Sequence, residues 1–140
     1  MIMNDDKNVV IDFISKPFFS FFEESDAKKI CIIEFKDLFY NTICSISTTD
    51  IEIYNLIDNI NEFLYTPNLL SEDYYFFKSI DSSMTNKVIL IQRGTNSDFI
   101  SPDIYLKIYE YIDEEMTLLL SLNMTTSIIS FLESLYDEFL

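Results

Sequence analysis

The sequence predicts an α+β fold in which two helices pack against a mostly antiparallel sheet. Several short runs alternate apolar and polar residues, which is typical of half-buried strands. Two longer stretches repeat apolar residues at helical spacing. Short polar turns separate neighbouring strand candidates, which favours hairpins and therefore an antiparallel sheet of about six to eight strands.

The length and composition favour a single domain over residues 1–140. The chain has 140 residues, of which 49% are hydrophobic and 16% aromatic. A chain of this size buries enough surface to fold without a metal ion or a disulfide. One Gly and three Pro leave little room for flexible linkers.

A unit of strand, turn, strand and helix occurs twice in the sequence. Residues 29–64 align without a gap with residues 105–140, so that Ile32 matches Ile108 and both copies end in Glu-Phe-Leu. We therefore predict a structural pseudo-repeat. The alternative is that a common arrangement occurs twice independently.

The first half of the chain contains three strand candidates and one helix. We expect strands at Val9–Ile14, Ile30–Phe35 and Tyr40–Ser47, with a short strand or bend at Phe18–Phe22. A helix begins at Thr49, where Glu52 completes a capping box and Asp50 adds negative charge to the first turn. Its apolar stripe comprises Ile53, Leu56, Ile57, Ile60, Phe63 and Leu64.

The second half contains four more strand candidates and the second helix. These strands are Tyr74–Ile80, Lys87–Arg93, Ile104–Tyr109 and Met116–Leu122, and Asp113–Glu115 forms the last turn. Thr125 or Thr126 is expected to cap the final helix. Its apolar stripe comprises Ile128, Phe131, Leu132, Leu135 and Phe139.

The two cysteines, Cys31 and Cys44, fall in the first hairpin. A loop at Lys36–Phe39 would place them directly opposite each other, which leaves a disulfide open. Since nothing indicates export, we expect two reduced, half-buried thiols.

The formal net charge is −15, from 24 acidic and nine basic residues. Such a charge repels nucleic-acid backbones and anionic membranes, so neither is an expected partner. It suits either a solvated surface or a surface that binds a basic protein. Met1–Asn8 is polar and acidic, unlike a signal peptide, and the apolar runs are too short to cross a membrane, so we expect a cytoplasmic protein.

The residues needed for most catalytic chemistry are missing. The chain has no His, the usual general base and metal ligand, and its one Gly cannot build a phosphate-binding loop. With many acidic residues a catalytic carboxylate pair stays open. We expect no enzymatic activity, no metal and no cofactor.

Acidic residues and tyrosines in the last unit form the candidate partner-binding surface. Tyr supplies contact area at low entropy cost, and carboxylates speed docking to a cationic partner. Each acidic cluster taken alone is more typical of a solvated turn or helix face. The candidate residues are Tyr109, Glu110, Tyr111, Asp113, Glu114, Glu115, Glu133 and Asp137.

The order of elements resembles the small bacterial immunity proteins of polymorphic-toxin systems, particularly the WapI-like group. The resemblance rests on Lys29–Ile33 and Thr49–Glu52 in the first unit, and on Tyr105–Ile108 and Leu118–Leu122 in the second. It covers residues 30–140 as a pattern of elements. It implies a non-enzymatic protein that binds and neutralises a cognate toxin, commonly a nuclease, without a fixed site motif.

Two other functions suit the same charge. A nucleic-acid mimic that inhibits a host nuclease would share the acidity, and a scaffold protein would self-associate through exposed aromatic residues.

Overall fold

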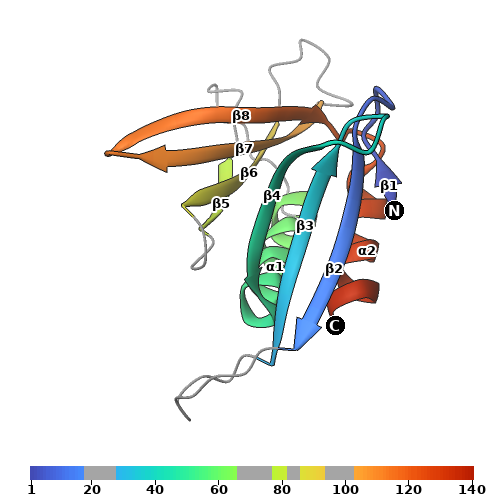
Figure 1. Ribbon diagram of the computed structural model, residues 1–140. Helices are drawn as coiled ribbons and strands as arrows, with labels where there is room; N and C mark the ends of the chain where they lie inside the picture. Colours follow the sequence, from blue (N-terminus) through green and yellow to red (C-terminus); the bar gives the residue numbers. More distant parts are fainter. Residues whose placement is uncertain (18–27, 66–76, 82–85, 94–102) are drawn as a thin grey trace.

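The computed structural model describes residues 1–17, 28–65, 77–81, 86–93 and 103–140, and within them the predicted α+β fold is confirmed (Figure 1). Eight antiparallel strands and two helices are present in these ranges. They are β1 (Ile2–Met3), β2 (Val10–Pro17), β3 (Lys29–Lys36), β4 (Thr42–Thr49), α1 (Asp50–Tyr65), β5 (Phe77–Asp81), β6 (Lys87–Arg93), β7 (Ile104–Ile112), β8 (Glu115–Asn123) and α2 (Ile128–Phe139).

The strands form two four-stranded sheets, where the sequence suggested one. The first has the order β1-β2-β3-β4 and the second the order β5-β6-β7-β8. The division follows from the position of α1, because the chain passes from Thr49 in β4 directly into the helix at Asp50. The helix takes the chain away from the edge of the first sheet and then lies against β5, so β5 starts a second sheet.

One hydrophobic core joins both sheets and both helices. The helix α1 packs on β3 and β4, and α2 packs on β1 and β2, while the two helices also contact each other. The ring of Phe13 in β2 lies 6.1 Å from that of Phe131 and 5.8 Å from that of Phe139, both on α2. Burying such side chains stabilises the fold by roughly 1.5–3 kcal/mol each.

The first helix begins at the predicted position, and of the predicted capping box the bond to the Thr49 hydroxyl is present. The Glu52 amide donates a hydrogen bond of 3.3 Å to Oγ1 of Thr49, as a capping residue requires. The Asp50 carboxylate also accepts hydrogen bonds from the Lys28 and Lys29 amides at 3.1 and 3.4 Å. One side chain therefore joins the start of β3 to the start of α1. The predicted apolar stripe is buried at Ile53, Leu56, Ile57, Ile60 and Phe63.

The second helix has a different cap from the one predicted. Oγ1 of Thr125 donates to Oδ1 of Asn123 and accepts a bond from the Ile104 amide, so it is engaged elsewhere. The cap comes instead from the N-terminus, where the Asp5 carboxylate accepts hydrogen bonds from the Thr126 amide, the Ser127 amide and the Ser127 hydroxyl. The predicted apolar stripe is buried at Ile128, Phe131, Leu135 and Phe139.

The two cysteines do not lie opposite each other. The loop between β3 and β4 covers residues 37–41, and the register pairs Cys31 with Thr48 and Cys44 with Phe35. The loop begins one residue later and is one residue longer than expected, and the register shifts once more between Phe35 and Lys36. Both thiols are free and buried, and burial raises the pKa of each to about 11. The sequence left a cross-strand disulfide open on the condition that Cys31 and Cys44 face each other. Because they do not, that alternative is wrong.

The two copies of the proposed repeat share their order of elements but differ in packing. The helix α1 lies on its own hairpin, β3–β4, whereas α2 lies on β1 and β2. The turns also differ, since residues 37–41 join one hairpin and residues 113–114 the other. The structural pseudo-repeat stays a prediction. The prediction for Phe18–Phe22 and the start of the predicted strand at residues 74–76 lie outside the described residues.

Candidate protein-binding surface

The β7–β8 hairpin extends beyond the rest of its sheet. The last pair between β6 and β7 joins Lys87 to Glu110, and beyond it the ladder of β7 continues only with β8. The Tyr111 amide donates to the Asn86 carbonyl at 2.7 Å, and Nδ2 of Asn86 donates to the Tyr111 carbonyl at 2.8 Å. Figure 1 shows the hairpin as an arm that points away from both helices.

The tip of the hairpin is a two-residue turn made of two acidic residues. Ile112 pairs with Glu115, and the residues between them, Asp113 and Glu114, have φ angles of 51° and 68°. Positive φ at both positions is the geometry of a type I′ turn, which matches the twist of the strands and usually contains Asn-Gly. Asp tolerates this conformation, but at Glu114 it costs roughly 1–2 kcal/mol.

Apolar side chains are exposed directly behind this acidic turn. In the register, Tyr111 faces Met116 and Tyr109 faces Leu118, so these four side chains share one face of the hairpin. Tyr111, Ile112, Met116 and Leu118 are 42% to 52% exposed. We call Tyr109, Tyr111, Met116 and Leu118 the hairpin patch, and Ile112 lies on the opposite face of the hairpin. Clustered exposed apolar residues with a polar rim are typical of protein-binding surfaces.

The charge at the tip of the hairpin is negative. Asp113 and Glu114 border the hairpin patch in the turn, and Glu110 and Glu115 lie on the opposite face of the hairpin. The nearest cation in the register is Lys87, which lies opposite Glu110, and no Lys or Arg follows Lys107 in the sequence. Among the described residues, the salt bridges are those of Lys36 with Asp12 and Glu34, so the hairpin carboxylates have no cationic partner there. Their field is therefore free to act on a binding partner.

The structure divides the predicted site residues into two groups. Tyr109, Glu110, Tyr111 and residues 113–115 lie together on the hairpin. Glu133 and Asp137 are exposed on α2, which packs on β1 and β2 and lies away from the hairpin tip (Figure 1). These two residues are therefore not part of the same surface patch. Partner binding by either group stays a prediction.

A second exposed apolar segment, the β3–β4 loop at residues 37–41, was not predicted from the sequence. Leu38, Phe39 and Tyr40 are exposed, and Phe39 is the most exposed large hydrophobic residue in the described chain, at 85%. The Asp37 carboxylate holds the loop by accepting bonds from the Phe39 and Asn41 amides at 2.8 and 2.9 Å. An Asp side chain that accepts a bond from the amide two residues later forms an Asx turn. Asp37 in the predicted loop was therefore a signal for this geometry.

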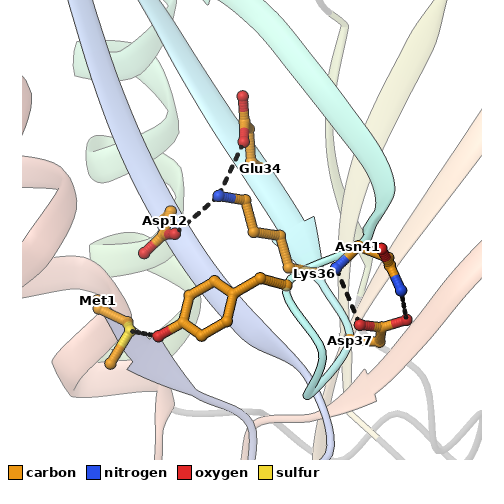
Figure 2. A network of polar contacts seen from close by, with 7 residues as sticks. Met1, Asp12, Glu34, Lys36, Asp37 and Asn41 are labelled. Atoms are coloured by element: carbon orange, nitrogen blue, oxygen red, sulfur yellow. Dashed lines mark hydrogen bonds and ion pairs between the residues drawn. The ribbon is translucent and has the colours of Figure 1, made fainter.

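A polar network supports this loop (Figure 2). Nζ of Lys36 lies 3.1 Å from Asp12 and 3.3 Å from Glu34, and 5.7 Å from the centre of the Tyr40 ring. Hydrogen bonding to Asp12, and then to Glu34, outweighs desolvation and raises the pKa of Lys36. The backbone bond from Asn41, followed by those from Phe39 and the Asn41 side chain, outweighs desolvation and lowers the pKa of Asp37. Here acidic groups are paired, in contrast to those of the hairpin.

Neither metal binding nor similarity to known proteins identifies this surface. Within the described ranges, no group of three or more His, Cys, Asp or Glu residues is placed to hold a metal ion. Neither α1 nor α2, the helices of the described residues, combines the length and the apolar character that crossing a membrane requires.

Comparison with family models, curated proteins and solved structures found no match to this chain.

Proposed function

We propose that this chain is a cytoplasmic immunity protein, which binds a basic toxin domain and neutralises it without catalysing a reaction. One observation carries the proposal: the β7–β8 hairpin presents exposed apolar side chains beside an acidic turn, and none of its four carboxylates forms a salt bridge among the described residues. The resemblance of the order of elements to WapI-like immunity proteins agrees with this function.

The chemistry of the hairpin suits a toxin that acts on nucleic acid. A nuclease needs a cationic groove to hold phosphates. The turn at Asp113 and Glu114 would enter such a groove with its negative charge, and Tyr111 and Met116 would contact the apolar walls. Complementary charge speeds association, and the buried apolar anchors provide most of the affinity.

A growth experiment tests this function. The partner is identified by co-purification with the chain from its native host, the two are co-expressed, and survival is compared with that of cells that produce the partner alone. The hairpin variant carries Asp113→Lys, Glu114→Lys and Glu115→Lys, and the matched control on α2 carries Glu133→Lys, Asp137→Lys and Glu138→Lys. Both variants change the net charge equally, so a difference between them reflects location.

We expect the wild type and the α2 variant to protect the cells and the hairpin variant to fail. In vitro, the hairpin variant should associate with the toxin at least about tenfold more slowly at low salt, with little difference at high salt. Absence of protection by the wild type would reject the immunity function. Equal protection by all three proteins would reject the hairpin as the binding surface.

A further inference from the structure

We propose that the outer edge of β8 binds an extended, basic segment of the partner protein as an additional strand of the second sheet. The inference rests on the proposed function and specifies how the partner is held. In this mode the main chain provides hydrogen bonds, and alternate side chains of the incoming strand provide specificity.

Within the part of the chain that the structure describes, β8 lacks the features that normally protect a sheet edge. It is the last strand of its sheet, and Met116–Leu122 contains no charged residue, proline or glycine. Natural edges are usually shortened, covered, or interrupted by charges or proline. The other edges differ: β1 has two residues, and the sequence of β5 contains Lys78 and Asp81. The side chains of β4 are buried or half-buried from Cys44 onward, whereas those of Glu115–Leu118 in β8 are exposed.

The hydrogen-bond pattern shows which groups of β8 point outward. The Tyr111 amide donates to the Asn86 carbonyl, on the β6 side, and is therefore not bonded to Met116 across the hairpin. In an antiparallel ladder, pairs that exchange backbone hydrogen bonds alternate with pairs that do not. Tyr111 and Met116 form a pair of the second kind, so the amide and carbonyl groups of Met116 point to the outer edge. Leu118 lies two residues further along and has the same orientation.

The two ends of the open edge limit the length of the binding segment. A bulge at Ile108/Tyr109 leaves Leu119 without an opposite residue, so regular pairing extends from Glu115 to Leu118. At the far end of β8 the Asn123 carbonyl already accepts a hydrogen bond of 2.9 Å from the Asp5 amide. The incoming segment therefore pairs next to the acidic tip and not along the whole strand.

Charge decides between a basic partner and a second copy of this chain. A basic segment next to Glu115 neutralises the carboxylates of the tip, whereas a second copy brings another net charge of −15. Salt weakens attraction between opposite charges and also weakens repulsion between like charges. Binding to a basic segment should therefore decrease with salt, and self-association should increase.

Amide hydrogen exchange on the full chain, measured by NMR, tests the inference without the toxin. The probe is a synthetic peptide in which two Lys precede an alternating Val-Thr segment, and its control has two Glu in place of the Lys. We expect the Lys peptide, at millimolar concentration, to slow exchange of the Met116 and Leu118 amides. The Glu peptide should bind at least about tenfold more weakly at low salt, and the difference should shrink at high salt.

Two variants at one position separate the strand edge from the side chain. Leu118→Pro removes the outward amide and should abolish peptide binding, whereas Leu118→Ala keeps the amide and should retain most of it. Exchange protection of the Glu110 and Thr117 amides, which pair with each other across the hairpin, reports that the hairpin is intact in both variants.

Three outcomes would overturn the inference. They are unchanged exchange at Met116 and Leu118, equal binding of the Lys and Glu peptides, and protection of β8 in the peptide-free protein that grows with protein concentration and salt. The last would show that a second copy occupies the edge. Since no toxin is present, such a failure leaves the immunity function standing, and failed protection in the growth experiment leaves the peptide result standing.

Discussion

The cap of α2 by Asp5 gives a specific prediction about stability. The substitution Asp5→Ala removes the acceptor of three hydrogen bonds, from the amides of Thr126 and Ser127 and from the Ser127 hydroxyl. Loss of a helix cap typically costs about 1 kcal/mol, and loss of a carboxylate at the positive end of the helix dipole adds about 0.3–1 kcal/mol. We expect the free energy of unfolding to fall by about 1–2 kcal/mol, or Tm to fall by about 3–7 °C for a chain of this length.

Urea denaturation followed by circular dichroism at neutral pH measures this loss. The matched control is Asp6→Ala, which makes the same change of charge at the exposed neighbouring residue. The control should change stability by less than about 0.5 kcal/mol, with the same dependence on urea in all proteins. Equal losses for Asp5→Ala and Asp6→Ala would refute the assignment of Asp5 as the cap.

The same contact predicts a dependence on pH. Burial raises the pKa of Asp5, but the hydrogen bonds from the Ser127 side chain and from Thr126 and Ser127 outweigh it and lower the pKa below 3.8. A carboxyl whose pKa is lowered on folding stabilises the protein above its unfolded pKa, and this contribution is lost as the pH falls through the folded pKa. The difference between wild type and Asp5→Ala should therefore be constant from neutral pH down to about pH 4 and shrink below it. A difference that persists through the acid range would contradict this account.

Three further predictions concern the core, the thiols and the hairpin turn. Phe131→Ala should lower the free energy of unfolding by about 3–5 kcal/mol because the ring is fully buried, whereas Tyr136→Ala, exposed on the same helix, should change it by about 0.5 kcal/mol or less. Cys31 and Cys44 should react with a chromogenic disulfide reagent at neutral pH only slowly in the native protein and rapidly in urea, because burial raises the pKa of each thiol to about 11; equal rates would contradict it. Replacing the turn Asp113–Glu114 by Asn-Gly should raise the free energy of unfolding by about 1 kcal/mol, because Asn and Gly adopt positive φ at a lower cost than Asp and Glu. Unchanged or lower stability in urea would contradict the conclusion that the turn is strained.

The features predicted correctly from the sequence depend on local physics. The buried stripe of α1 and its cap at Thr49 follow from residue spacing within one element. The alternation in β7 similarly predicted that Ile104, Leu106 and Ile108 share the buried face. In each case the information lies within a few residues, so one sequence is sufficient.

The features that were missed depend on distant contacts or on loop length. Nothing near Ser127 in the sequence indicates that its cap comes from Asp5, at the other end of the chain. The prediction that the two cysteines face each other was wrong because the register of β3–β4 depends on where the loop begins and how many residues it contains. The division into two sheets depends on where α1 packs, which periodicity does not determine.

The candidate site was predictable in part. The alternation and the acidic turn placed the hairpin correctly, but the exposure of Ile112 and Met116 depends on the fact that β6 begins pairing only at Lys87 and Glu110. Clustering of α2 acids with the hairpin was expected from their shared unit. It does not occur because α2 leaves that unit and packs on β1 and β2.

The hairpin and the β3–β4 loop differ in a way that bears on function. In the loop, Asp37 and Lys36 have satisfied partners. Both segments contain positive φ, at Tyr40 in the loop and at Asp113 and Glu114 in the tip, and both expose apolar side chains, so these features do not separate them. The tip combines them with adjacent like charges that form no salt bridge among the described residues, whereas folding alone would favour Asn-Gly there. A basic partner with an apolar groove would relieve the charge repulsion and cover the apolar surface together, which is why the hairpin is the stronger candidate of the two.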